Sequence, residues 1–296
     1  ISELIAAGDL RGKQGELTLL HSFGRLPAKR LLVAGLGKSA EFNVDRVREL
    51  SANIARFLRG KRVATFATIA HGAGIGGLDA AACAQAIAEG AVLGLYRFDR
   101  HKKPDDDATE IDAITILERD AARVSAMNAA AERGVIMADA ANFARDLANE
   151  PSNVLTPTEF AARAEAMAAA NGLGFTVFDR ERAEEMGMGA FLGVAKGSAQ
   201  PPKFMMLTYS GGGEGGTLGL IGKGITFDTG GISIKPAAGM EDMKGDMSGG
   251  AAVIAAMMAI ARLKPAINVT ALVPATENMP GGNATKPGDR LRAMNG

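Results

Sequence analysis

Residues 220–231 read LIGKGITFDTGG, and residues 232–250 continue the stretch with ISIKPAAGMEDMKGDMSGG. The apolar residues at its start predict a strand, and the glycines that follow predict a loop that carries Lys223 and Asp228. Asp246 comes shortly before a small, apolar segment that predicts a helix. Proteins of the α/β class build their sites where strands end and helices begin, so this stretch predicts an α/β fold with a site at its strand ends.

Segments on both sides of this stretch alternate between strand patterns and helix patterns. Short apolar runs rich in β-branched residues predict strands, and apolar residues at three- and four-residue spacing predict helices. This alternation predicts α/β architecture along the whole chain. The predicted strands cover residues 31–36, 63–70, 111–117, 175–178, 204–209, 218–221, 232–234 and 267–273, and the predicted helices cover residues 44–58, 78–95, 121–149, 156–172 and 247–263, with one more around Ala183.

Two domains are predicted, because 296 residues exceed the usual length of a single domain. An alanine-rich helix at residues 121–149 would connect a first domain, residues 1–120, to a second domain, residues 150–296. The run Thr156-Pro-Thr-Glu159 has the pattern of a capping box with proline at the first helical position, and so predicts a helix start in the second domain. The charged residues 102–107 predict a solvated loop in the first domain.

The composition argues against several function classes. Lys and Arg together number 33, as do Asp and Glu, so the net charge is zero and nucleic acid is not the expected partner. The longest apolar run, residues 249–261, is too short to span a bilayer, which predicts no membrane segment. The single Cys83 cannot form an internal disulfide and fits a reducing compartment, so we expect a cytoplasmic protein.

The two ends of the chain predict that it is a fragment of a longer protein. Ile1 is not a methionine, and no basic and apolar signal peptide follows it. Asn295 and Gly296 form a turn pattern that normally introduces another element. We therefore expect the C-terminal part of the second domain to be missing.

Two other motifs carry little functional weight. Gly37-Lys38-Ser39 follows a predicted strand as the end of a phosphate-binding loop would, but Leu32 stands where the first glycine of that loop belongs. The three histidines, His21, His71 and His101, all lie in the first domain, which excludes a three-histidine zinc site in the second. His71 is expected to be a structural histidine with satisfied hydrogen bonds.

The aspartates and lysines of residues 220–250 support two interpretations. Buried carboxylates need a cation partner or a metal ion. Near divalent metals one lysine can coordinate as a neutral amine while another stays charged and polarises a carbonyl oxygen, and Lys223 and Lys235 are the candidates for these two roles. The alternative is that these residues form surface salt bridges worth about 0–1 kcal/mol each. Spacing alone leaves both interpretations open.

Residues 222–250 resemble the signature region of the leucyl aminopeptidase family, the cytosolic aminopeptidases with two metal ions. The resemblance extends to NEPSNVLTP at residues 149–157, to Glu277-Asn-Met-Pro280 and to Lys286-Pro-Gly-Asp289. Residues 1–120 fit the family's smaller N-terminal domain only in their general pattern. The resemblance implies a macro-like α/β first domain and an α/β aminopeptidase catalytic domain, the latter incomplete in this chain.

The resemblance also implies a role for each site residue. Lys223 and Asp246 would bind the tighter metal ion, and Asp228 would bridge both ions. Lys235 would be the catalytic lysine beside the scissile carbonyl, stabilising the oxyanion that forms there. Met243 would line the substrate pocket together with Lys235 and Asp246, although a plain core position for Met243 is the alternative because the chain has 14 methionines.

The family uses a later Asn-Thr-Asp-Ala-Glu-Gly-Arg run, which we expect beyond Gly296. Its Asp and Glu would complete the metal shells, and its Arg would hold a bicarbonate that acts as general base. Lys223, Asp228 and Asp246 alone cannot fill two shells of roughly four to six donors each. Residues 1–296 by themselves are therefore expected to be inactive.

The sequence thus predicts a metal-dependent leucyl aminopeptidase that removes N-terminal, preferably leucine-like residues from peptides. The implied cofactors are two divalent ions, Mn²⁺ or Zn²⁺, with bicarbonate as a further one, and the implied assembly is a homohexamer in the cytoplasm. The alternative is a non-catalytic binding or scaffold protein of the same fold, with DNA as a conceivable partner that the neutral charge argues against.

Overall fold

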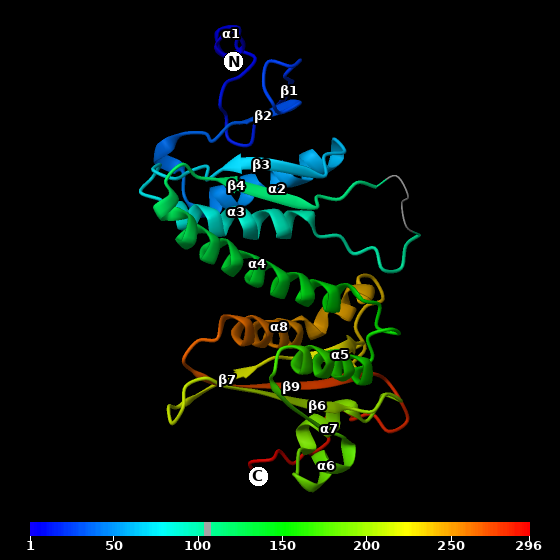
Figure 1. The fold of residues 1–296 in the computed structure, drawn as a ribbon. Helices are drawn as coiled ribbons and strands as arrows, with labels where there is room; N and C mark the ends of the chain where they lie inside the picture. Colours follow the sequence, from blue (N-terminus) through cyan, green and yellow to red (C-terminus); the bar gives the residue numbers. More distant parts are fainter. Residues whose placement is uncertain (104–107) are drawn as a thin grey trace. The chain divides into compact units, whose positions relative to one another are not determined.

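A computed structural model describes residues 1–103 and 108–296, so the predicted loop at residues 102–107 lies partly outside the described residues. The chain divides into two compact units, Ile1–Asp139 and Ala140–Gly296. The division falls inside α4 (Ala121–Asn149), a helix with the same bounds as the predicted connecting helix (Figure 1).

The first unit pairs its strands two by two. β1 (Leu17–His21) and β2 (Arg30–Ala34) form an antiparallel hairpin, whereas β3 (Thr65–Ile69) and β4 (Ala113–Leu117) are parallel. The unit is therefore α/β, as predicted, although β1 was not expected. Its helical elements are α1 (Ser2–Ala6), η1 (Ser39–Glu41), α2 (Val44–Gly60), α3 (Ala80–Leu95) and the part of α4 up to Asp139.

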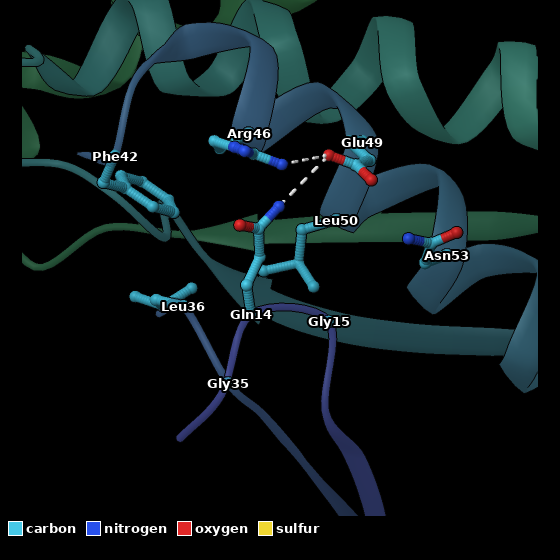
Figure 2. A pocket seen from close by; sticks show the side chains of 9 residues that line it. All are labelled: Gln14, Gly15, Gly35, Leu36, Phe42, Arg46, Glu49, Leu50 and Asn53. Carbon is cyan, nitrogen blue, oxygen red and sulfur yellow. Dashed lines mark hydrogen bonds and ion pairs between the residues drawn. The ribbon is translucent and has the colours of Figure 1, made fainter. Parts of the chain in front are cut away.

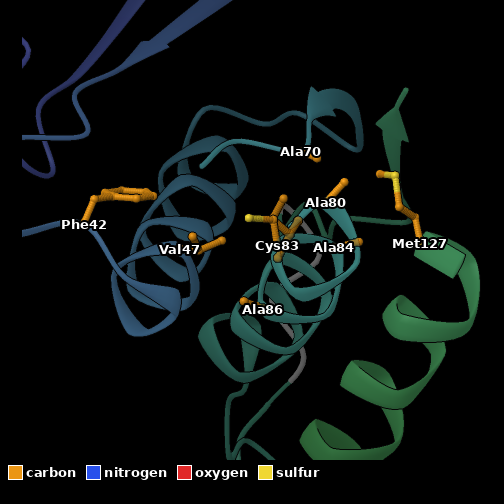
Figure 3. Packing of buried hydrophobic residues seen from close by; sticks show 9 residues of the cluster. Phe42, Val47, Ala70, Ala80, Cys83, Ala84, Ala86 and Met127 are labelled. Carbon is orange, nitrogen blue, oxygen red and sulfur yellow. The ribbon is translucent and has the colours of Figure 1, made fainter. Parts of the chain in front are cut away.

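Helices α2 and α3 form the centre of the first unit. Both begin at capping side chains, because Asn43 accepts a hydrogen bond from the Arg46 amide and Asp79 accepts one from the Ala82 amide. A Cβ on Gly90 of α3 would lie 2.1 Å from a backbone oxygen of α2, so the two helices approach too closely for a side chain there. Figure 3 shows the buried cluster around them, which includes Phe42, Val47, Cys83 and Met127.

The structural role expected for His71 agrees with its surroundings. The ring Nε2 lies 3.2 Å from the Ser51 hydroxyl, and Ser51 itself is buried. Burial lowers the pKa of His71 below its ordinary value, since the charged ring is poorly solvated there, although hydrogen bonds with the backbone of Val47 and Ile69 oppose the shift. Partial burial therefore favours the neutral form of this ring.

The second unit is a five-stranded sheet whose longest strand, β9 (Asn268–Asn278), lies inside it. The strand order is β5-β6-β9-β7, with β8 also paired to β9. The first half of β9 pairs with β7 and its end pairs with β8, both in parallel, while β6 runs antiparallel along its other edge. The remaining strands are β5 (Gly174–Phe178), β6 (Lys203–Ser210), β7 (Thr217–Ile221) and β8 (Gly224–Asp228).

Helices cover both faces of this sheet. In Figure 1, α5 (Pro157–Ala170) and α8 (Ser248–Leu263) lie on one face, and α6 (Arg180–Glu185) and α7 (Gly189–Ala195) lie on the other. The predicted capping box is partly formed, since the Thr156 hydroxyl accepts a hydrogen bond from the Glu159 amide. The 3₁₀-helix η2 (Met240–Met247) leads directly into α8.

Two predictions around the site are wrong. Residues 232–234 do not form a strand, because Gly230 and Gly231 adopt φ angles of +88° and +68° and turn the chain away from the sheet. Gly224–Asp228, expected as loop, is instead strand β8, so Asp228 is the last residue of a strand and Lys223 lies in the short link before it. Pairing with the distant β9 makes this strand, and local sequence does not reveal such a partner.

The helical stretch Met240–Leu263 is long and apolar enough to cross a membrane by length and composition alone, and half of its most apolar window is buried inside the protein. The core helix of a soluble protein passes the same test, and α8 packs on strands β6 to β9 of the sheet. Packing therefore accounts for the apolar character of this helix.

One ion pair anchors the start of the second unit and supports a stability prediction. The Glu150 carboxylate, 2% exposed, lies 2.8 Å from the Arg163 guanidinium of α5. Arg163→Met is expected to lower the free energy of unfolding by about 3 kcal/mol, since it removes the guanidinium that lies 2.8 Å from a buried carboxylate. Urea denaturation measures the change. The matched control is Arg182→Met, whose partner Glu185 is exposed, and an equal loss in both variants would contradict the role of burial.

Candidate functional site

The predicted site residues all lie in the second unit, where β8 ends beside η2. Asp228 ends β8, and Lys235 lies in the loop that follows it. Met243 and Asp246 belong to η2, and Lys223 lies between β7 and β8. Three close contacts arrange these five residues in two groups. Lys235 contacts both Asp228 and Met243, and Lys223 forms an ion pair with Asp246.

The first pair joins Lys235 to Asp228. The Lys235 ammonium lies 2.8 Å from Asp228 Oδ2, and it also lies 3.5 Å from the sulfur of Met243. The other carboxylate oxygen, Oδ1, accepts hydrogen bonds from the Gly230 amide at 2.8 Å and from Asn278 Nδ2 at 2.7 Å. Asp228 therefore has a partner for each oxygen although its side chain is only 14% exposed.

These partners decide the charge of Asp228. Partial burial by itself would raise the pKa of the carboxyl group, because the ionised form loses hydration. The hydrogen bonds from Lys235, Gly230 and Asn278 outweigh burial and hold the pKa of Asp228 below its ordinary value. The side chain is thus a carboxylate anion at neutral pH, which is the form that binds a cation.

The loop after β8 brings Lys235 back to the strand end. Its glycines allow the turn, and a Cβ on Gly230 would lie 2.4 Å from the Ser233 carbonyl oxygen. The Lys235 amide then donates to the Thr229 carbonyl oxygen at 2.9 Å, which closes the loop. Lys235 consequently lies beside the carboxylate seven residues before it.

The second pair joins Lys223 to Asp246. The Lys223 ammonium lies 2.6 Å from Asp246 Oδ2, and the Asp246 side chain is 22% exposed. The start of α8 packs on the backbone of this link, because the Gly250 amide donates to the Lys223 carbonyl oxygen at 2.6 Å. A Cβ on Gly222 would lie 2.5 Å from the Gly249 carbonyl oxygen, so this approach requires glycine.

Helix η2 brings the two pairs to one side. Met243 contacts Lys235 of the first pair, and Asp246 contacts Lys223 of the second. In a 3₁₀-helix the side chains of residues i and i+3 lie nearly above one another. Met243 and Asp246 have this spacing, so one face of η2 borders both lysines.

The ion pairs are those that the salt-bridge alternative expected, but their setting differs from the exposed one it assumed. Both carboxylates are more buried than exposed, and the Oδ2 atom of Asp246 is itself buried, with the Lys223 ammonium 2.6 Å away. Burying a carboxylate oxygen costs solvation free energy, and a single ion pair offsets this cost less well than a divalent cation bound to the same oxygen. This favours the metal-binding interpretation over plain surface salt bridges.

The donors present fit part of a metal centre. Asp228 and Asp246 supply carboxylate oxygens, and Lys223 supplies an amine. Within the described residues, no group of three or more His, Cys, Asp or Glu side chains lies close enough together to hold a metal ion. Two carboxylates and one amine are fewer donors than even one full shell of roughly four to six requires.

A cavity of about 310 Å³ lies beside the residues that hold the Asp228 carboxylate. Its wall includes Gly230 and Asn278, the two residues that hold Asp228 Oδ1. Met243 is not among the residues that line this cavity. The other lining residues come from α7, from the loop after β8 and from the segment after β9, namely Gly193, Val194, Gly231, Ile232, Ser233, Met279, Ala284, Thr285, Lys286, Pro287 and Leu291.

The contact of Asn278 with Asp228 is not evident from the sequence. The residue falls in the run Glu277–Pro280, which was singled out only as part of the family resemblance. In the structure it ends β9, directly opposite Asp228 at the end of β8. The relation would have been visible only if β8 had been predicted as a strand parallel to β9.

A smaller cavity in the first unit does not compete as a substrate site. Figure 2 shows that Gln14 and Arg46 both point to the Glu49 carboxylate, at 3.4 Å and 3.1 Å. Its volume of about 50 Å³ has room for water but not for a peptide. The Gly37-Lys38-Ser39 motif forms no phosphate loop either, since Lys38 pairs with Glu41 at 3.5 Å and η1 has only three residues.

Two family models match this chain. The model for the catalytic domain of the cytosol aminopeptidase family matches residues 142–296, and the model for the N-terminal domain of the same family matches residues 1–105. Together they cover most of both units. The two matches lie in the same order as the two predicted domains.

The chain is also similar to individual proteins of known name. It is 46% identical to a probable cytosol aminopeptidase of Alkaliphilus metalliredigens (strain QYMF), covering 100% of this chain and 60% of that protein. It is 47% identical to a probable cytosol aminopeptidase of Solibacter usitatus (strain Ellin6076), covering 99% of this chain and 60% of that protein. Its structure resembles that of the bottromycin maturation enzyme BotP in complex with Mn, with a TM-score of 0.88 and 34% identity, covering 100% of this chain and 61% of that one. The chain therefore spans about 60% of the length of these relatives.

Proposed function

The chain belongs to the cytosol aminopeptidase family, and on this premise we propose that the full-length gene product is a metal-dependent aminopeptidase. Membership confirms the family resemblance of residues 222–250 and the two-domain α/β fold expected from it. The proposed substrates are peptides with a free N-terminus, preferably with leucine-like first residues. The relatives' names support aminopeptidase activity, and the substrate preference is our own extension.

One observation carries this proposal: two partly buried carboxylates are each held by a lysine, and both lysines contact the same face of η2. Asp228 and Asp246 would hold the metal ions together with the amine of Lys223, and further donors would come from outside residues 1–296. Divalent ions bound there would supply Lewis-acid activation of the substrate carbonyl and of a water molecule. Mn²⁺ or Zn²⁺ are the proposed ions, and the Mn in the related BotP structure supports the former.

Lys235 is the proposed catalytic residue of this chain. Its ammonium lies at the edge of the site, within hydrogen-bonding distance of Asp228 Oδ2. A charged donor placed there can donate a hydrogen bond to the carbonyl oxygen of the substrate as negative charge develops on it. Met243, whose sulfur contacts the Lys235 ammonium, would border the first side chain of the substrate.

The remaining properties follow the family and are proposals for the whole protein. We propose a homohexamer in the cytoplasm, in line with the cytosol aminopeptidase name of the relatives. A bicarbonate held outside residues 1–296 would act as general base. No nucleic acid partner is proposed, since the chain has no net positive charge.

Hydrolysis of blocked and unblocked substrates tests the activity. We expect the full-length gene product to hydrolyse leucine p-nitroanilide and to leave N-acetyl-leucine p-nitroanilide intact, because an aminopeptidase needs the free amino group. Equal hydrolysis of both would mean a different specificity. No hydrolysis of either, together with a DNA mobility shift that disappears at moderate salt, would favour the scaffold alternative.

Residues 1–296 alone are expected to be inactive, because they supply only part of the donor set. The test compares this chain with the full-length gene product at saturating Mn²⁺, using leucine p-nitroanilide. Circular dichroism of both proteins controls for folding. A folded 296-residue chain that hydrolyses at the full-length rate would contradict the need for further donors.

A further inference from the structure

The ends of β8 and β9 form a compact junction beside the proposed metal site. Asp228 and Asn278 are opposite one another in the parallel register and are the last residues of their strands. The Asn278 carbonyl oxygen accepts hydrogen bonds from the Thr229 amide at 2.9 Å and from the Thr229 hydroxyl at 2.8 Å. The backbone of Asn278 is therefore fixed on the residue next to Asp228.

The side chain of Asn278 is fixed as well. Its Nδ2 donates to Asp228 Oδ1 at 2.7 Å. Its Oδ1 faces Gly231, where a Cβ would lie only 2.8 Å away. Because Gly231 also has a φ of +68°, glycine at this position both allows the turn and leaves room for the amide.

These contacts give the two oxygens of the Asp228 carboxylate different partners. Each oxygen of a carboxylate has about two lone-pair sites. Two N–H donors, Asn278 Nδ2 and the Gly230 amide, already occupy Oδ1. Within the described residues, the Lys235 ammonium is the only hydrogen-bond or ion-pair partner of Oδ2, so Oδ2 is the oxygen left for another cation.

We propose that Asn278 is a positioning residue that holds Asp228 Oδ1, so that Oδ2 is the atom presented to metal ions. This inference rests on the proposed function and adds a residue to which no role had been given. In this role Asn278 acts through Asp228 and is not itself a metal ligand. Partners that orient a metal-binding side chain typically contribute about 10- to 100-fold to metal affinity.

The test is Mn²⁺ binding to the full-length gene product, measured by equilibrium dialysis without substrate. Asn278→Ala removes the donor and is expected to raise the Kd for Mn²⁺ about 10- to 100-fold. Asn278→Gln keeps an amide donor and is expected to bind Mn²⁺ more tightly than Asn278→Ala. Thermal unfolding of the metal-free variants shows whether each is folded, and the glutamine variant keeps the test decisive if the alanine variant unfolds.

Asn268 provides a matched control at the opposite end of the same strand. Its Nδ2 also donates hydrogen bonds that close a loop, to the carbonyl oxygens of Gly213 and Gly215 at 3.0 Å each. Asn268→Ala is expected to leave the Kd for Mn²⁺ unchanged. A merely structural role for Asn278 would make both alanine variants less stable without separating their Mn²⁺ affinities.

The outcomes separate this inference from the proposed function. If the wild-type protein binds Mn²⁺ and hydrolyses leucine p-nitroanilide while Asn278→Ala keeps the wild-type Kd, only the positioning role is overturned. Equal weakening by Asn268→Ala would overturn it too. A wild-type protein that binds no Mn²⁺ would overturn the proposed function and the positioning role together.

Discussion

Replacing Lys235 with alanine is expected to lower kcat of the full-length gene product about 100- to 1,000-fold with leucine p-nitroanilide at saturating Mn²⁺. The ammonium is the donor proposed for the developing oxyanion, and loss of one such donor typically costs about 2.7–4 kcal/mol in the transition state. The variant also removes the ammonium that lies 2.8 Å from Asp228 Oδ2, a cation that would compete with a metal ion for this oxygen. The metal content should therefore not fall. Steady-state kinetics and atomic absorption on the same samples measure both quantities.

The control for this variant is Lys38→Ala, which removes an exposed lysine that also pairs with an acid. Its kcat should equal that of the wild type. Wild-type kcat in Lys235→Ala would show that Lys235 has no catalytic role. A loss of bound metal in proportion to the loss of rate would instead mean that Lys235 supports the metal site.

Replacing Asp228 with asparagine is expected to abolish stoichiometric Mn²⁺ binding and to reduce hydrolysis to the rate of the metal-free protein. The carboxylate is held as an anion by Lys235, Gly230 and Asn278, and the neutral amide cannot balance a divalent charge. The asparagine side chain also replaces one carboxylate oxygen with an NH₂ group. That group would face an N–H donor that binds the oxygen in the wild-type protein. Equilibrium dialysis with Mn²⁺ measures the binding directly.

Asp45→Asn provides the control, because Asp45 pairs with Arg48 in the first unit and is largely exposed. It should bind Mn²⁺ as the wild type does. Circular dichroism shows whether Asp228→Asn is folded, since the variant also loses charged hydrogen bonds in the metal-free state. A folded Asp228→Asn variant that binds Mn²⁺ stoichiometrically would contradict the assignment of Asp228 as a ligand.

Local patterns predicted the helices well. The stripe of apolar residues in 44–58 predicted α2, and the members Val47, Leu50, Ile54 and Leu58 are all buried in the structure. The long helix α4 was found with the predicted bounds. These elements were predictable because helical hydrogen bonds and helical faces arise from residues close together in sequence.

Strands near the site were harder to predict, because their partners are distant in sequence. The run 232–234 has a strand composition, yet Ile232 and Ile234 are 46% and 63% exposed after the glycine turn. Strand β8 begins at a glycine and lies between glycines, so its composition favours a loop. Its pairing with the end of β9, some 50 residues later, decides its conformation.

The sequence predicts which residues gather at the site, but it does not predict which of them contact one another. The motif placed Lys223, Asp228, Lys235 and Asp246 within one stretch, and all four do lie in two close ion pairs. Which lysine meets which aspartate depends on the turn at Gly230 and on the packing of α8 against the Lys223 link. Those are tertiary features, and for the same reason the contact of Asn278 with Asp228 could not be read from the sequence.

The most direct test of the metal-dependent aminopeptidase is chelation followed by metal restoration on the full-length gene product. Leucine p-nitroanilide hydrolysis is measured before chelation, after dialysis against a chelator, and after Mn²⁺ is added back. We expect hydrolysis to be lost with the metal and to return with Mn²⁺. Undiminished hydrolysis by protein from which all metal has been removed would contradict the role given to Asp228 and Asp246.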